Sequence, residues 1–370
     1  MRRSLVIVAA AAVAAVIAVI LLVTGTFGAA TDAGSSGAGS PGPGGANASG
    51  AAGRVTASGA AGRVTLRLGF VADVAQAPAL VGLREGLFAA ALHGTGIALR
   101  PVPFRTDVAE AAALAAGKLD AAYTSPDSIL AVLADSHGAK ISVVSGAAAG
   151  GAELVVRPGI ASPSELRGRT LAVPAAAGVQ DVALRSWLTA QRIGTGRGGV
   201  TIAAVMPDDV VREFRSGRIS GAWMPAPYDV ELAEAGGRVL ATEESMPPGS
   251  RPAAVNLVVT RAFLSAHSAG VLALLKGQVQ ANDVVNHSLL ASAAAVTAEL
   301  AVLNGGRLSD SLVGASLAQT TFTDDPGAAS LAAEVPPGLT ASVSAAMPAL
   351  YDVAPLNLIL RMAGEQPVSA

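Results

Sequence analysis

The stretch from residue 66 to 88, LRLGFVADVAQAPALVGLREGLF, opens the globular part of the chain and indicates its fold class. From residue 64, polar and apolar residues alternate and then give way to an apolar run, as in a strand that enters a core. Residues 77–92 follow with apolar residues at helical spacing. Pro78 suits a first helical turn, where its missing N–H is not needed. The stretch therefore predicts a strand followed by a helix.

The same alternation continues through two similar units, one up to residue 150 and one from about 151. In the first unit, further strands are predicted at 97–104, 120–124 and 140–147, with helices at 107–119 and 125–137. In the second unit, strands are predicted at 152–159, 170–174, 200–206, 219–224 and 238–242, with helices at 162–168, 179–193, 207–217 and 227–236. Strand–helix alternation implies parallel pairing with helices on both faces of each sheet.

A strand at 254–260 returns to the first unit, and the chain is mainly helical from there on. The pattern therefore predicts an α/β protein of two lobes, with lobe 1 at 64–150 plus 253–370 and lobe 2 at 151–252. In open α/β sheets, ligands bind beyond the carboxyl ends of the strands. A ligand cleft is expected at the lobe junction, lined by residues that directly follow strands.

The N-terminus predicts export. Arg2 and Arg3 precede an apolar run from Leu5 to Val23, whose length of about 19 residues would span roughly 28 Å as a helix. That length, close to the roughly 30 Å hydrocarbon core, favours a retained membrane anchor within residues 1–28. A cleaved signal peptide is the alternative, since Gly28 and Ala30 are small enough for a cleavage site.

Residues 29–63 are rich in Gly, Ala, Ser and Pro and predict a disordered linker, because they cannot bury enough surface to offset their ordering entropy. The sequence ASGAAGRVT occurs at 48–56 and again at 57–65. A slipped repeat in a tolerant linker explains this duplication, and its second copy is expected to lead into the first strand.

Composition excludes several function classes. The chain has 370 residues, a net charge of −2 and no Cys. Nucleic acid is therefore an unexpected partner, and disulfides, a Cys nucleophile and a lipid-modified Cys are excluded. The four His residues are scattered without metal-ligand spacing. The glycines at 194–199 follow a predicted helix instead of opening one, so they indicate a turn and no phosphate loop. No cofactor is predicted.

Four phrases in order carry a resemblance to a known family: 66–88, GKLDAAYTSPDSIL at 117–130, SPSELRGRTLAVPAAAGVQDVALRSWL at 162–188 and SGRISGAWMPAPYDVELAEAGGRVL at 216–240. Two more, TTFTDDPGAASL at 320–331 and LYDVAPLNLIL at 350–360, extend it to the tail. Together they resemble the substrate-binding proteins of ABC importers that handle nitrate, taurine and aliphatic sulfonates. The resemblance implies a type 2 periplasmic-binding fold, a small-molecule solute held by hinge closure, and an ABC permease as partner.

The resemblance also implies the residues that contact the solute, all of which lie in or beside loops that follow strands. They are Asp73, Gln76, Ala77, Tyr123, Thr124, Ser125, Asp127, Gly178, Gln180, Asp181, Trp223, Pro225 and Tyr228. Two departures from the family pattern concern the identity of the solute. The family often has His where Gln76 stands, and an acidic and aromatic pair where Ala226 to Tyr228 stand.

Several of these residues also have a structural interpretation. Ser125 to Asp127 form a complete helix cap, Gly178 can permit a turn, Gln180 and Asp181 can cap a helix, and Trp223 can be a core residue. The loops contain no Arg or Lys but three Asp. These charges argue against a bare inorganic anion as the solute. They are compatible with a zwitterion such as taurine, a neutral solute or an amine. The family resemblance still favours a sulfonate as the first candidate.

Two other functions compete with a solute receptor. Desulfinases and pyrimidine-precursor synthases resemble this family, but they are disfavoured because the chain has no Cys and its predicted cleft loops have no His. A ligand-sensing domain is the other alternative. Its signal would need a second protein, since the residues before the apolar run are too few to form an output domain.

Overall fold

The computed structural model describes residues 64–135, 140–176, 178–246, 253–305, 308–327, 343 and 346–369. The predicted anchor or signal peptide, the linker and the first copy of the repeat lie outside these residues. The end of the second copy, Val64 and Thr65, opens strand β1 (Val64–Val71) as expected. Within the described residues no single helix has the length and apolarity to cross a membrane. One pair of helices, bent by 114° between Ser268–His287 and Leu289–Asn304, meets that criterion jointly.

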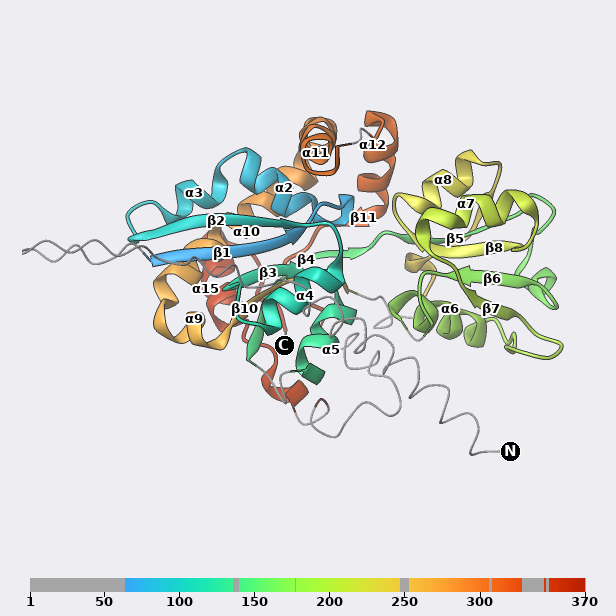
Figure 1. Ribbon diagram of the computed structural model, residues 1–370, viewed down its shortest axis with the longest axis horizontal. Helices are drawn as coiled ribbons and strands as arrows, with labels where there is room; N and C mark the ends of the chain where they lie inside the picture. The colour runs from blue at the N-terminus through green and yellow to red at the C-terminus, as the bar shows by residue number, and fades with distance from the viewer. Residues whose placement is uncertain are drawn as a thin grey trace, which may run out of the picture. The chain divides into compact units, whose positions relative to one another are not determined.

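Six strands form the sheet of the first lobe, in the order β11-β4-β10-β3-β1-β2 (Figure 1). Besides β1 they are β2 (Ile97–Phe104), β3 (Ala121–Thr124), β4 (Ile141–Gly150), β10 (Ala253–Thr260) and β11 (Thr320–Thr321). β1 pairs in parallel with β2 and with β3. β2 contains Pro101 and Pro103 and lies at the edge of the sheet, where a residue without an N–H is tolerated.

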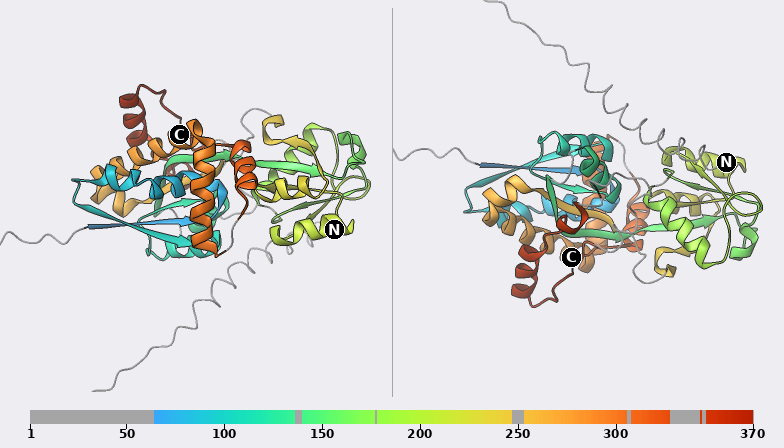
Figure 2. Two further views of the ribbon diagram at one scale, coloured as in Figure 1. Left: turned by 90° about the horizontal axis from the view of Figure 1, so that it is seen from above. Right: turned by 90° about the horizontal axis from the view of Figure 1, so that it is seen from below.

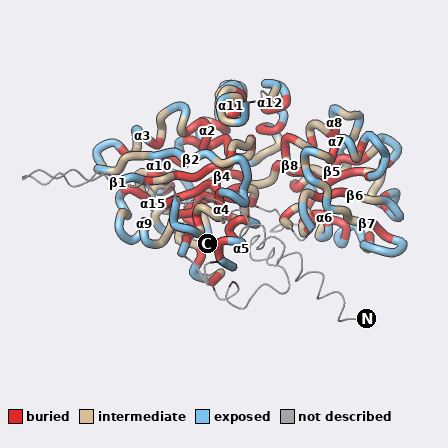
Figure 3. The backbone as a smooth tube through the Cα atoms, viewed as in Figure 1, coloured by how far each residue is buried: buried red, intermediate tan, exposed pale blue. Residues whose placement is uncertain are grey.

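Helices cover both faces of this sheet, and two hydrophobic cores result. On one face, α2 (Ala77–Arg84), α3 (Leu87–Leu92), α10 (Ser268–His287) and α11 (Leu289–Asn304) pack over Leu66, Leu68 and Phe70 of β1. On the other face, α4 (Asp107–Ala115) and α5 (Pro126–Asp135) pack over Ala122 and Val258. β1, β3, β4 and β10 are buried along most of their length (Figure 3), whereas the edge strand β2 is not. Other α-helices among the described residues of this lobe are α9 (Arg261–Ala266), α12 (Asp310–Gln319) and α15 (Ala354–Ala363).

Five strands form the sheet of the second lobe, in the order β7-β6-β8-β5-β9. They are β5 (Ala152–Val156), β6 (Thr170–Val173), β7 (Thr201–Ala204), β8 (Gly221–Pro225) and β9 (Arg238–Thr242). Helix α6 (Val179–Ala190) covers one face. Helices α7 (Pro207–Ser216) and α8 (Tyr228–Glu234) cover the other. Both sheets thus carry helices on two faces, as the alternation predicted.

The prediction of parallel pairing is wrong for β10 in the first sheet and for β5 in the second, and the two-residue strand β11 also pairs antiparallel with β4. β10 runs antiparallel to β3 and β4, and β5 runs antiparallel to β8 and β9. The reason is the path of the chain. β5 follows β4 directly and enters its sheet from the opposite end, with no crossover helix to reverse its direction. The α/β alternation itself is confirmed, because β1 is parallel to β2 and β3, and β6 is parallel to β7 and β8.

Two predicted helices differ in detail. The segment 77–92 is broken into α2 and α3 at Gly86, whose φ of +70° is left-handed and ends the first helix. The segment 162–168 forms only a short 3₁₀ helix, Pro163–Leu166. The predicted helical character of the C-terminal part is confirmed in its described residues, which include α9, α10, α11, α12 and α15.

The passage from the first to the second lobe is made by Gly150 and Gly151, both with left-handed φ angles of +72° and +85°. Residues with a Cβ would be strained in this conformation. The two successive glycines therefore allow the chain to turn between the lobes. Helix α12 lies beside this passage. It packs against α8 of the second lobe and against the 3₁₀ helix Val74–Gln76 (η1) of the first (Figure 1 and Figure 2).

Candidate functional site

The first wall of the candidate site is built where β1 ends. Asp73 precedes η1 and its Oδ1 accepts a hydrogen bond of 2.8 Å from the amide of Ala75. Burial raises the pKa of the Asp73 carboxyl to about 6, and the charge of Asp107 contributes in the same direction. The first wall thus places Asp73 within electrostatic reach of a second acidic residue, Asp107.

Asp107 and Asp127 lie in the first turns of two further helices of this wall. Asp107 is the first residue of α4, which is capped by the Thr106 hydroxyl accepting from the amide of Ala109 at 3.2 Å. Asp127 lies in the first turn of α5, where the Ser125 hydroxyl accepts from the amide of Ser128 at 3.3 Å. The pKa values of Asp107 and Asp127 are both raised, mainly by desolvation, and that of Asp127 is also raised by Asp107.

Asp127 reaches the second lobe. Its Oδ2 accepts a hydrogen bond of 3.4 Å from the amide of Val179, the first residue of α6. Gly178 makes room for this contact, since a Cβ at that position would lie 3.3 Å from the same oxygen. The carboxylate thus occupies the N-terminal end of α6, where the helix dipole and a free amide favour negative charge.

The second wall continues with Tyr228, the first residue of α8. Its hydroxyl donates to Oδ1 of Asp208 in α7 at 3.3 Å. Burial raises the pKa of the Tyr228 phenol, and so do the nearby charges of Asp208 and of Asp73 across the site. Residues that follow strands in the two lobes therefore lie near one another here. We call this group of residues the interlobe site: Asp73, Asp107 and Asp127 from the first lobe, and Val179, Asp208 and Tyr228 from the second. That a solute binds there stays a prediction.

Other predicted contact residues lie behind these walls. The side-chain Oε1 of Gln76 accepts a 2.8 Å hydrogen bond from the amide of Val71 and so fixes the end of β1. Tyr123 donates its hydroxyl hydrogen to Oε1 of Gln278 and packs beside Phe88. Trp223 is fully buried beside Trp187 in the core under α6. Such burial favours a supporting role over the direct contact predicted for these three residues, and the contact itself stays a prediction.

Some of the other predicted residues are buried in the core, and the rest are half-buried beside the interlobe site. Ala77 and Thr124 are fully buried at the ends of η1 and β3. Asp181 is buried and forms an ion pair of 2.7 Å with Arg185, one turn further along α6. Ser125, Gly178, Gln180 and Pro225 are half-buried beside the interlobe site.

Sequence reasoning missed Asp107, Asp208 and Glu110. Asp107 begins the predicted helix 107–119, and Asp208 is the second residue of the predicted helix 207–217. Each closely follows a predicted strand, and that position was the available signal. Glu110 lies one turn after Asp107 and is 0 % exposed. Nothing in the sequence distinguishes it from a solvent-facing glutamate of an amphipathic helix.

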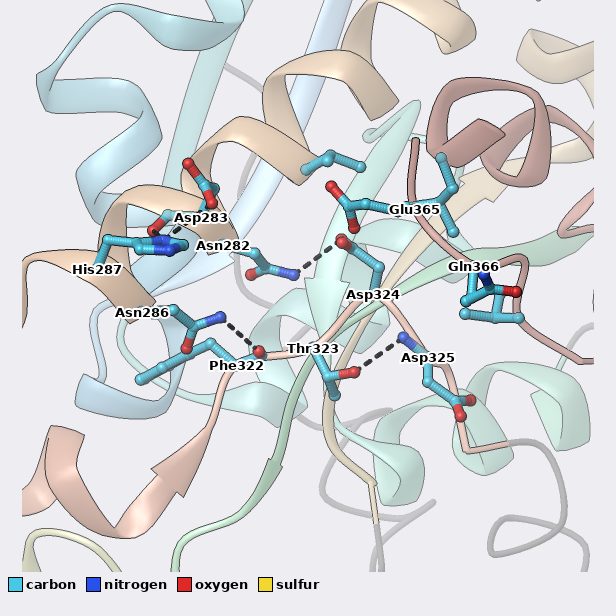
Figure 4. Close-up of a pocket in the computed structure, with 13 residues that line it drawn as sticks. Asn282, Asp283, Asn286, His287, Phe322, Thr323, Asp324, Asp325, Glu365 and Gln366 are labelled. Carbon is cyan, nitrogen blue, oxygen red and sulfur yellow. Dashed lines mark hydrogen bonds and ion pairs between the residues drawn. The ribbon is translucent and has the colours of Figure 1, made fainter. Parts of the chain in front are cut away.

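A polar pocket of about 500 Å³ lies elsewhere in the first lobe, between α10, residues 322–325 and the C-terminal residues 365–368 (Figure 4). In it, Nδ2 of Asn282 donates to Asp324 at 2.8 Å and Nδ2 of Asn286 donates to the carbonyl of Phe322 at 2.9 Å. These bonds hold residues 322–324, part of a family phrase, against α10. The pocket contains none of the predicted contact residues, so we do not place the site there.

Comparison with solved structures shows the fold. The structure resembles the aliphatic sulphonate-binding protein SsuA of Escherichia coli, with 16% identity, a TM-score of 0.55, and coverage of 83% of this chain and 93% of that one. It also resembles the nitrate-binding protein NrtA of Synechocystis PCC 6803, with 11% identity, a TM-score of 0.60, and coverage of 81% and 89%. A third similar structure is SsuA of Xanthomonas axonopodis pv. citri bound to MOPS, with 17% identity, a TM-score of 0.55, and coverage of 80% and 97%.

The fold is therefore that of the periplasmic binding proteins, with two α/β lobes, as the resemblance in the sequence implied. The sequence profile of the NMT1-like family matches residues 59–302, so the chain belongs to the NMT1-like family. No curated protein matches the sequence.

Proposed function

We propose that the protein is the extracytoplasmic solute receptor of an ABC importer. In this function it captures a small solute between lobe 1 (64–150 plus 253–370) and lobe 2 (151–252) and delivers it to a membrane permease. One observation carries the proposal: loops that follow strands in both lobes converge on one place, where Asp127 contacts the first amide of α6 at 3.4 Å. A receptor that closes around its solute needs contacts that both lobes complete together.

The chemistry of the interlobe site supports binding without catalysis. Its carboxylates and phenol can orient a solute, while the chain has no Cys to serve as a thiol nucleophile. The neighbours in structure are named as binding proteins for sulfonates and nitrate. A sulfonate, taurine or nitrate-like solute is accordingly the first candidate from resemblance.

Closure of the lobes is the test of this function. The chain has no Cys, so two introduced cysteines can be spin-labelled selectively. The two labelling positions are Ala131→Cys on α5 and Ala190→Cys on α6. Both alanines are exposed and lie away from the site. Electron–electron distance measurements should show a shift to shorter distances when the native solute, recovered from cell extract, is added. A matched pair within the first lobe, Ala131→Cys with Ala90→Cys, should not move. An unchanged distance across the lobes with solute bound would contradict the proposed closure.

We also propose that the apolar run at 5–23 tethers the receptor to the membrane. Its length matches the bilayer, and no Cys is present to carry a lipid. The protein from its native host is expected in the membrane fraction with an intact N-terminus, released by detergent but not by high salt. N-terminal sequencing checks this, and a mature chain that begins near Thr31 would establish a cleaved signal instead.

A further inference from the structure

The polar pocket of the first lobe is lined by more acidic than basic side chains. Asp324, Asp325 and Glu365 line it, and they join none of the ion pairs found among the described residues. The described residues of the lining include no Lys or Arg. Their one His, His287, lies 2.9 Å from the carboxylate of Asp283. The charge around this cavity is therefore mainly negative.

Two of these acids come together on one side of the pocket. Figure 4 shows the carboxylates of Asp324 and Glu365 pointing toward each other, one from residues 322–325 and the other from the C-terminal residues. Burial raises the pKa of Asp324 to about 6, the hydrogen bond from Asn282 lowers it, and the charge of Glu365 raises it. Like charges in a partly desolvated space repel unless a proton or a cation compensates them.

Asn282 provides a second observation that is independent of the acids. Its residue is 2 % exposed, and Figure 4 shows its carboxamide extending from α10 toward Asp324, to which Nδ2 donates at 2.8 Å. The other polar atom of this carboxamide, Oδ1, is buried and has no hydrogen-bond partner among the described residues. A buried acceptor without a donor is costly. Since Asn282 lines the pocket, a ligand that donates hydrogen bonds there would satisfy it.

The carboxamide donors on α10 are already used within the protein. Nδ2 of Asn282 donates to Asp324, and Nδ2 of Asn286 donates to the carbonyl of Phe322 at 2.9 Å. The pocket therefore offers acceptors: the carboxylates of Asp324 and Glu365, and Oδ1 of Asn282. A protonated primary amine matches this set, because it carries three N–H donors and a positive charge. A metal ion matches less well, since no group of three or more His, Cys, Asp or Glu in the described residues is placed to hold one.

We propose that the polar pocket is a second ligand site, distinct from the interlobe site, which binds a small solute through a protonated primary amine. The ammonium group lies between the carboxylates of Asp324 and Glu365 and donates a hydrogen bond to Oδ1 of Asn282. The rest of the solute occupies the remainder of the cavity of about 500 Å³.

The segment that carries Asp324 is also attached to β4. Thr320 of β11 pairs with Gly150 at the passage between the lobes, and the carbonyl of Asp324 accepts a 2.8 Å hydrogen bond from the amide of Gly146. A bound amine joins this segment to α10 and to the C-terminal residues at once. Binding is therefore expected to slow amide hydrogen exchange in residues 322–325.

Titration calorimetry with matched probes tests the proposal on the full-length protein in detergent at pH 7. The amines are ethanolamine, putrescine and glucosamine. Their controls are ethylene glycol, 1,4-butanediol and glucose, in which hydroxyl groups replace the amines, and calcium chloride is the metal probe. At least one amine should bind more tightly than its control and slow exchange in residues 322–325. The inference is overturned if no amine binds, if the controls bind equally well, if calcium binds in place of amines, or if exchange in 322–325 is unchanged. The receptor function is tested separately by lobe closure.

Two adjacent aspartates offer a matched pair of variants. Asp324→Asn retains an oxygen that can accept from Asn282 but loses the charge, so it should weaken amine binding at least about tenfold, which is about 1.4 kcal/mol. Asp325 accepts instead from the amide of Gly327 at 2.9 Å, and Figure 4 shows its carboxylate pointing away from Asn282. Asp325→Asn should leave the affinity unchanged. Circular dichroism checks that both variants are folded, and equal affinities in the two would contradict the assignment.

The pH dependence of amine binding gives a further readout. The affinity should be highest above about pH 6 and fall as the solution is acidified, because the carboxyl of Asp324, with a pKa of about 6, then takes up a proton and loses its charge. In Asp324→Asn this part of the profile should disappear, and identical profiles for the variant and the parent would contradict the proposal. The other ionisable groups around Asp324 come from β3, α10, the same segment and the C-terminal residues: Tyr123, Asp283, His287, Asp325 and Glu365.

Discussion

Gly146→Ala is expected to lower the stability of the protein strongly. Gly146 lies in β4, and a Cβ there would stand 2.2 Å from the carbonyl oxygen of Asp325 and 2.8 Å from that of Thr323. Both clashes are with backbone, which cannot rotate away. The residue's own amide also donates to the carbonyl of Asp324 at 2.8 Å. Overpacking of this severity costs about 3 kcal/mol or more, measured as a fall in the free energy of unfolding in urea.

Gly314→Ala is the control for that measurement. Gly314 lies inside α12, and its added methyl group would meet only Ala293 at an ordinary 3.9 Å. Because alanine favours a helix over glycine, this variant should be stabilised by up to about 1 kcal/mol. If Gly146→Ala retained the stability of the parent, residues 322–325 would not be packed against β4 as described.

Trp223→Ala is expected to lower the free energy of unfolding by about 3–5 kcal/mol, as for other large buried aromatic residues. The indole is 0 % exposed and packs 6.3 Å from the ring of Trp187 in the core of the second lobe. Its Nε1 has no hydrogen-bond partner among the described residues. Trp223→Phe should therefore lose much less, because it retains most of the apolar volume and removes a buried donor without an acceptor.

Denaturation monitored by far-ultraviolet circular dichroism gives the stability of both variants. Met362→Ala, at a side chain that is 78 % exposed, serves as the surface control and should stay within about 0.5 kcal/mol of the parent. If Trp223 instead contacts the solute, as the resemblance in the sequence implies, Trp223→Ala should remain folded and bind the solute more weakly. A variant of unchanged stability with weakened binding would favour that prediction over the supporting role argued here.

The strands were predictable because their signals are local. Residues 97–104 match β2 completely, and the two prolines that make them unusual are tolerated because the strand lies at an edge. The direction of a strand relative to its neighbours in the sheet was not predictable in the same way. Whether β5 and β10 run parallel to their neighbours depends on the end from which the chain enters the sheet, and the residues inside a strand do not record it.

The site was predictable only to the level of its loops. Strand ends identified Asp73, Asp127 and Tyr228, and their contact with a solute stays a prediction. The same rule selected Tyr123 and Trp223, since a residue at a strand end can point into the core or out of it, and one residue of register decides which. Asp107 and Asp208 were missed because an aspartate at a helix start already has a sufficient local explanation.

The position of β10 has a consequence for how the protein is made. Ribosomes deliver the chain from its amino end, so β3 and β4 exist long before residues 253–260, which pair with both of them, are synthesised. All five strands of the second sheet lie between residues 152 and 242 and can associate earlier. A nascent chain that has passed residue 242 thus holds a complete small sheet beside two exposed, apolar strand edges. During that interval the growing polypeptide is most prone to pair with other chains.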